Sequence, residues 1–101
     1  MGAHTFMSSV YAPTASEGYA LLVEEAVYEE GHNAYNGTIS TTNGFTMDPR
    51  MNTESSAQWG ERVTEDPQYE KWGNCACTEA VHVEKNDKGW PLWHFAGWAA
   101  S

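Results

Sequence analysis

Two cysteines, Cys75 and Cys77, are of a residue type that binds metal ions, although their spacing of one intervening residue is not typical of a metal site. Thiolates and imidazoles are ligands of zinc, and Cys75 and Cys77 have His82 nearby in the chain. On an extended strand Cys75, Cys77 and Glu79 share one face, whereas His82 has the opposite parity. The paired CxxC spacing of strong zinc sites is missing. Although His94 could approach from a partner strand, the sequence predicts two small, reduced and buried thiols rather than a metal site.

A second ionisable cluster lies at the end of the first predicted helix. Glu29, Glu30 and His32 are close enough in sequence for acid–base chemistry or for binding a divalent cation. Acidic helix ends that are exposed to water are common, so an enzyme is only the third hypothesis. The chain has no P-loop, dinucleotide fingerprint, nucleophile elbow or metalloprotease helix. We therefore assign no catalytic residue, no metal and no cofactor, and the sequence leans against an enzyme.

The C-terminal stretch WPLWHFAGWAAS contains Trp90, Trp93 and Trp98, three of the five tryptophans. Side chains alternate between the two faces of a strand, and here both faces are largely apolar. One face would hold Leu92, His94, Ala96 and Trp98, and the other Trp93, Phe95 and Ala99. Such a strand is either central in its sheet and covered on both sides, or exposes an aromatic surface that binds something. The first interpretation is favoured, because buried indoles can replace scarce aliphatic side chains.

Length and charge restrict the class of protein. The chain has 101 residues and a formal net charge of -9, so we expect a single domain over residues 1–101 with an aromatic-rich core. No apolar stretch is long enough for a membrane span and no secretion signal precedes the first strand, which predicts a cytoplasmic protein. No Lys or Arg precedes Arg50. This negative half should repel nucleic acid and acidic membranes and attract cationic partners.

Local signals place the elements of the first half. The segment HTFMSSVYA predicts a strand that Pro13 ends, and Thr14 with Glu17 forms a capping box that opens a helix running to Gly31. The segment GTISTTNGFTMD predicts a β-hairpin. A three-residue loop that pairs Thr41 with Phe45, and Ile39 with Met47, keeps the apolar side chains on one face.

Two further strands follow a second helix. Ser55 and Gln58 can form another capping box, and Pro67 ends the helix that they open. The segments NCACTEAVHVE and WPLWHFAGWAA then predict two strands joined around residues 86–89. The resulting order is βαββαββ, a variant of the ferredoxin-like order. We expect an α+β fold with an antiparallel sheet of about five strands and two helices packed on one face.

Several short motifs resemble those of a known group of proteins. They are Gly31-His32, Tyr35-Asn36-Gly37-Thr38-Ile39, Lys71-Trp72-Gly73 and Phe95-Ala96-Gly97-Trp98-Ala99. Over residues 32–99 the chain resembles a family of small uncharacterised bacterial and bacteriophage proteins. The resemblance brings no established activity. It implies a phage or prophage setting, and hence the host cytoplasm, where small non-enzymatic proteins often block host defences.

Two functions follow from these observations. The first is a non-enzymatic protein that binds a small planar ligand in an aromatic pocket, as a phage counter-defence protein would sequester a nucleotide-type immune signal. Its candidate ligand-binding residues are Tyr35, Arg50, Lys71, Trp72, Trp90, Trp93, His94 and Trp98. The alternative is an acidic mimic of nucleic acid that binds a basic host defence protein. Its candidate surface is Glu17, Glu24, Glu25, Glu29 and Glu30. The apolar last strand, if it lies at a sheet edge, could also pair two copies into a homo-oligomer.

Overall fold

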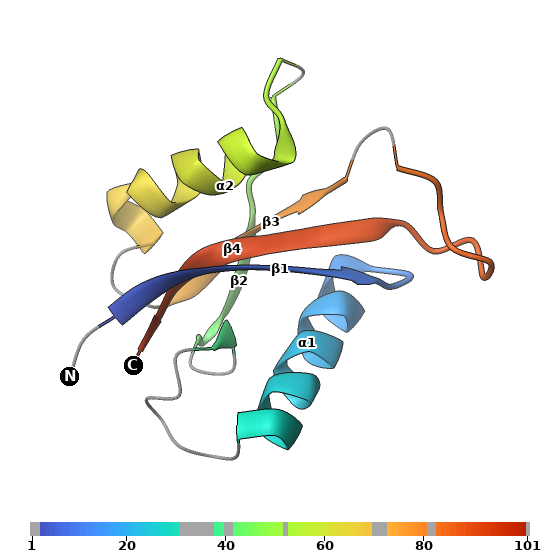
Figure 1. The fold of residues 1–101 in the computed structure, drawn as a ribbon, viewed down its shortest axis with the longest axis horizontal. Helices are drawn as coiled ribbons and strands as arrows, with labels where there is room; N and C mark the ends of the chain where they lie inside the picture. Colours follow the sequence, from blue (N-terminus) through green and yellow to red (C-terminus); the bar gives the residue numbers. More distant parts are fainter. Residues whose placement is uncertain are drawn as a thin grey trace.

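The structure is a computed structural model that describes residues 3–30, 38–39, 42–51, 53–69, 73–80 and 83–100, except for the side chains of residues 3, 30 and 100. Strands and helices follow one another as shown in Figure 1. They are β1 (Ala3–Tyr11), α1 (Ala15–Glu30), β2 (Gly44–Met47), α2 (Ser56–Glu65), the 3-10 helix η2 (Pro67–Tyr69), β3 (Asn74–Glu79) and β4 (Leu92–Ala100). Within the described residues, no helix is long and apolar enough to cross a membrane.

Both helices begin where the capping residues predict. The Thr14 hydroxyl oxygen accepts a hydrogen bond from the Glu17 amide at 3.2 Å, and α1 begins at the next residue, Ala15. At α2 both halves of the capping box are present, because Ser55 accepts from the Gln58 amide and the Gln58 side chain accepts from the Ser55 amide. These bonds satisfy amide groups that a helix leaves unpaired in its first turn. The sequence prediction of both helices is confirmed.

The sheet contains four strands in the order β1-β4-β3-β2. β1 and β4 are antiparallel over their full lengths, from Ala3 opposite Ala100 to Tyr11 opposite Leu92. β3 is antiparallel to β4 and parallel to β2. The fold is therefore a small α+β fold with a mixed sheet, and the expectation of about five antiparallel strands is wrong.

The difference arises at the predicted hairpin. Ile39 does not lie in a strand opposite Met47, because the Thr42 amide and hydroxyl both donate to the Ile39 carbonyl oxygen and turn the chain there. Thr41 lies outside the described residues. The strand β2 instead pairs in parallel with β3, with Phe45 opposite Cys75 and Met47 opposite Cys77. A parallel neighbour requires a long crossover, and α2 supplies it.

The two helices cover opposite faces of the sheet, not the single face that the sequence led us to expect (Figure 1). On the α1 side, Leu22 packs with Cys75, Cys77 and Phe95. On the α2 side lie Trp59, Val63, Tyr69, Ala76 and Ala96. The central strands β3 and β4 contribute to both clusters through alternate residues, which is why both of their faces are apolar.

This arrangement explains the aromatic C-terminal strand. β4 lies between β1 and β3 and is covered by a helix on each side, which confirms the interpretation of a central strand. The predicted pairing of two copies required the last strand to lie at a sheet edge. This condition is not met, because the edges of the sheet are β1 and β2.

Candidate functional site

The tryptophans of β4 do not share one pocket. Trp98 is half-buried against the cluster on the α2 side, where its indole N–H donates to the Thr64 carbonyl oxygen at 2.8 Å. Trp93 packs on the α1 side, and its indole N–H donates to the Ala12 carbonyl oxygen at 2.9 Å. Each hydrogen bond fixes the orientation of its ring. The structure thus separates Trp93 from Trp98 by the thickness of the sheet.

Trp90 lies in the connection between β3 and β4. The Asn86 side chain accepts from the amides of Lys88 and Trp90, which orders the turn. The Lys88 ammonium lies 4.7 Å from the centre of the Trp90 ring, within the range of a cation–π contact. Three other predicted ligand-binding residues, Tyr35, Lys71 and Trp72, lie outside the described residues, as do His32 and His82.

His94 is buried on the α2 side and bonded at both ring nitrogens. Its Nδ1 lies 2.6 Å from the Ser9 hydroxyl and its Nε2 lies 3.2 Å from the Ser56 hydroxyl. Burial lowers the pKa of His94 from its ordinary value of 6.5, so the neutral form is favoured. A neutral imidazole can donate at one nitrogen and accept at the other, and both roles are used here. His94 therefore joins β1, β4 and α2, and its cross-strand partner is Thr78.

Two of the predicted ligand-binding residues do meet. Arg50 and Trp93 line one open depression of about 370 Å³, together with Met47, Pro49, Thr78 and Glu79. The depression lies where β2 ends, and residues 48–50 stay bound to β3 beyond the strand. The Asp48 amide donates to the Cys77 carbonyl oxygen at 2.8 Å, and the Arg50 amide donates to the Thr78 hydroxyl oxygen at 2.9 Å. These bonds hold the Arg50 backbone at the rim.

The Arg50 guanidinium has unused binding capacity. Its Nε is buried, and it has no hydrogen-bond partner among the described residues. A buried N–H without a partner is costly, by about 1–3 kcal/mol, and a ligand that draws the Arg50 side chain into a hydrogen bond would remove that cost. A guanidinium recognises carboxylate and phosphate oxygens through a fork of N–H donors, while an indole offers a flat apolar surface. This pair therefore fits a planar anion.

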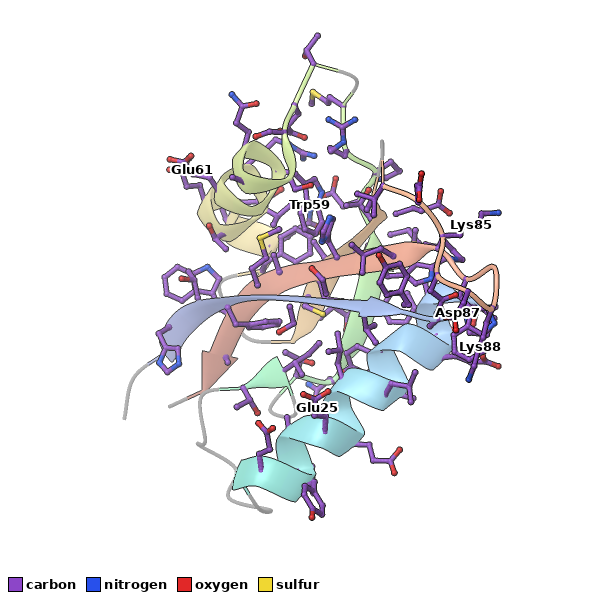
Figure 2. All side chains as sticks on the ribbon, turned by 45° about the vertical axis from the view of Figure 1, so that its right-hand side comes forward. Glu25, Trp59, Glu61, Lys85, Asp87 and Lys88 are labelled. Carbon is purple, nitrogen blue, oxygen red and sulfur yellow. The ribbon has the colours of Figure 1, made fainter. Side chains whose placement is uncertain are left out.

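Charge is distributed unevenly around this depression. Glu79 at its margin is exposed, and the exposed Lys85 and Lys88 lie in the loop that leads into the same end of β4 (Figure 2). The three cations near this end, Arg50, Lys85 and Lys88, are matched by three acids, Glu79, Glu84 and Asp87. This end of the sheet is therefore close to neutral, whereas α1 contains no Lys or Arg. The local field here opposes an anion less than the net charge of -9 would suggest.

The acidic residues of the alternative site lie along the exposed surface of α1, and two of them, Glu25 and Glu29, line a depression beside β1. Glu17, Glu24, Glu25 and Glu29 are all exposed, and the Glu30 side chain lies outside the described part. Within the described part of the chain, the ion pairs are formed by Arg62 alone, so none of these four carboxylates is neutralised there. Together they make the exposed surface of α1 negative, from its outer side to the margin beside β1.

A further polar cluster was not predicted from the sequence. Arg62 donates from Nε and Nη2 to the two Glu54 carboxylate oxygens and from Nη1 to the Asp48 carboxylate. Asp48 also accepts from the Tyr69 hydroxyl at 2.9 Å, and its carbonyl oxygen accepts from the Trp59 indole at 2.7 Å. Burial and the Asp48 carboxylate raise the pKa of Tyr69, which keeps its phenol a donor. Because these groups satisfy one another, the cluster fastens α2 and η2 to the end of β2.

The cysteines are free, buried thiols on the α1 side. Burial raises the pKa of Cys75 and of Cys77 to about 12, which disfavours the thiolate that metals and electrophiles require. Strand register places His94 on the opposite face of the sheet from Cys77, whose cross-strand partner is Phe95. In the described ranges no three His, Cys, Asp or Glu side chains are close enough to hold a metal ion.

Comparison with known proteins adds no relative to these observations: no family model, no curated protein and no solved structure matches the chain.

Proposed function

We propose that this chain is a non-enzymatic binding protein that holds a small planar anion between Trp93 and Arg50. The observation that carries the proposal is Arg50, which lines the same depression as the Trp93 indole and whose buried Nε has no hydrogen-bond partner among the described residues. A volume of about 370 Å³ lies at the low end of the range for small-molecule sites. The site therefore suits a ligand with one aromatic ring system.

The charge pattern narrows the ligand further. One guanidinium in the depression, a neighbouring Glu79 and a net charge of -9 favour a ligand with a single negative charge over a di- or triphosphate. A cyclic mononucleotide has one phosphodiester charge and a base that can stack on an indole. In the phage or prophage setting that the sequence resemblance implies, the ligand would be a nucleotide-type immune signal, and binding would sequester it without chemistry.

Titration with cyclic mononucleotides tests this proposal. Binding should change the Trp fluorescence and release calorimetric heat. Arg50→Gln should weaken binding at least about tenfold, because a charge-assisted hydrogen bond contributes about 1.5–3 kcal/mol. Lys85→Gln removes the same charge from an exposed loop residue outside the depression and serves as the matched control. Absence of binding across the panel, or equal effects of the two substitutions, would reject the proposal.

A second function is favoured by one observation, the four exposed acids of α1 that form no ion pair within the described part of the chain. We propose as the alternative that this surface mimics nucleic acid and occupies the basic groove of a host defence protein. Glu17→Gln and Glu24→Gln together should release a nucleic-acid-binding partner and restore its binding to DNA. DNA competition curves that are the same for the parent chain and for the double variant would count against the mimic.

A further inference from the structure

The two edges of the sheet differ in how they are protected. β2 has only four residues and continues into a segment that contains Pro49. β1 has nine residues, AHTFMSSVY, without a proline and without Asp, Glu, Lys or Arg. Natural sheets protect long edges with charges, prolines or bulges, because unpaired backbone groups invite another strand. β1 has none of these residues.

The unpaired backbone groups of β1 can be assigned. Beyond the end of the strand, the Ala12 amide donates to the Pro91 carbonyl oxygen at 3.2 Å, which makes this a hydrogen-bonded pair of the antiparallel ladder. Bonded and non-bonded pairs alternate along such a ladder, so Val10, Ser8 and Phe6 bond to β4. The backbone groups of Thr5, Met7, Ser9 and Tyr11 consequently point away from β4. β4 is the only described strand that pairs with β1.

Both sides of this edge are hollowed and acidic. On the α1 side, a depression of about 220 Å³ includes Phe6, Leu22 and Ala26, with Glu25 and Glu29 among its lining residues. On the α2 side, a depression of about 330 Å³ is lined by residues that include Met7, Gly60 and Glu61. Figure 2 shows Glu25 on α1 and Glu61 on α2, on opposite sides of the β1 ribbon. No Lys or Arg of the described part lines either depression.

We propose that the β1 edge binds an extended, basic segment of another protein, which adds a strand to the sheet. Backbone bonds to residues 5, 7, 9 and 11 would give affinity, and alternate side chains of the added strand would enter the two depressions. A Lys or Arg side chain fits such a depression, because its aliphatic stem covers apolar surface while its charge approaches a carboxylate. This site is separate from the Arg50–Trp93 depression.

A second copy of this chain fits the edge less well than a basic segment does. Its own β1 has no Lys or Arg, and pairing of two β1 strands would bring Glu25, Glu29 and Glu61 of both copies to one shared edge. Like charges that meet across an interface oppose association. Charge complementarity therefore selects a basic partner.

A defined peptide tests the inference. The probe is a decapeptide of Lys, Arg, Thr and Val whose basic residues fall on both faces of an extended strand, and the control is the same peptide with a central Pro. Amide hydrogen exchange by NMR should show new protection at Met7 and Ser9, whose N–H groups point outward, and none from the Pro-containing peptide. Equal binding of both peptides would overturn the proposal.

Charge reversal locates the site independently of the backbone. Glu25→Lys and Glu61→Lys, at exposed positions on the two helices, should each weaken peptide binding about threefold or more. Glu84→Lys makes the same charge change at an exposed loop position and should have a smaller effect. An equal effect of Glu84→Lys would mean that peptide binding depends on the overall charge of the protein and not on the β1 edge, which would overturn the proposal. Protection of the β1 amides in a dimer without peptide would assign the edge to a second copy and also overturn it.

Discussion

The two faces of the sheet are stabilised by different kinds of interaction. On the α1 side, Tyr19, Phe45 and Phe95 form a three-ring cluster with centroid separations of 5.4 to 6.0 Å. On the α2 side, buried polar groups of Trp59 and His94 are each hydrogen-bonded to a specific partner. Burial of apolar surface is non-directional and does not depend on one partner atom, whereas a buried donor depends on one acceptor. The comparison predicts that an isosteric substitution that removes a polar atom lowers the free energy of unfolding more on the α2 side than on the α1 side.

Truncation of the largest buried ring on each side should have the largest effect on stability. Trp59 and Phe95 are fully buried. Trp59→Ala and Phe95→Ala should each lower the free energy of unfolding by about 3–5 kcal/mol, because each leaves a cavity. Trp59→Ala should lie at the upper end, since it also leaves the Asp48 carbonyl oxygen without its 2.7 Å donor. Urea denaturation followed by circular dichroism measures both values.

The control for this pair is Tyr28→Ala on the outer side of α1, where the side chain is 90% exposed. Its unfolding free energy should stay within about 0.5 kcal/mol of the parent value. If Trp59→Ala were as mild as this control, the view that α2 is fastened through Trp59 would be wrong.

Removal of one hydroxyl group tests the polar side more directly. Tyr69→Phe keeps the buried ring but deletes the donor to Asp48, and should lower the free energy of unfolding by about 1–2 kcal/mol. Tyr19→Phe on the other side deletes a hydroxyl that bonds Thr42 from a half-buried ring. This loss should be the smaller of the two, since water can replace a bond near the surface. The reverse order would break the comparison between the faces.

Acidification should act on the α2 side through His94. Because burial lowers its folded pKa, the unfolded state takes up a proton first as the pH falls. The stability linked to neutral His94 is therefore complete above the unfolded pKa of about 6.5 and is lost as the pH falls through the lower folded value. Urea midpoints at neutral and mildly acidic pH measure the loss. A His94→Gln variant should lose less stability over this range, and an equal loss would assign the effect to other groups.

The sequence predicted the elements better than their partners, for a physical reason. Helix starts depend on neighbours three residues apart, so Thr14 and Ser55 could be recognised directly. The partner of β2 depends on residues about thirty positions away, as in the pairing of Phe45 with Cys75. Phe45 and Met47 lie on the same face of the strand, and this pattern suits a parallel or an antiparallel neighbouring strand equally well. The sequence therefore could not distinguish a hairpin from a crossover through α2.

The candidate site was predicted in a similar, partial way. Arg50 and Trp93 were both among the predicted ligand-binding residues, and the structure brings them together. The alternation of side chains along a strand already predicted that Trp93 and Trp98 lie on opposite faces of the sheet. The sequence thus indicated that these two tryptophans could not line one pocket. The Asp48–Arg62 contact had no such signal, because it requires α2 to return over the end of β2. The periodicity of side chains within one helix or strand does not indicate where α2 packs relative to β2.

The same small substitution on the two helices gives the finest test of the comparison. A β-carbon at Gly18 of α1 would lie 3.2 Å from Val10 Cγ1, 3.4 Å from Ala12 Cβ and 3.5 Å from Phe95 Cε1, so core atoms surround it. At Gly60 of α2 the close neighbour is Met7 Sδ at 2.9 Å, the far end of a flexible side chain that is 43% exposed. Alanine within a helix gains up to about 1 kcal/mol over glycine.

Gly60→Ala should therefore keep much of this gain, because Met7 can rotate toward water, and its unfolding free energy should equal or slightly exceed the parent value. Gly18→Ala must displace packed atoms of β1, so it should lose the gain and fall below Gly60→Ala by about 0.5–1 kcal/mol. Urea denaturation of the two variants in parallel measures this difference. If Gly18→Ala were the more stable variant, the apolar face would be loosely packed around Gly18, and the close contacts there would not limit stability.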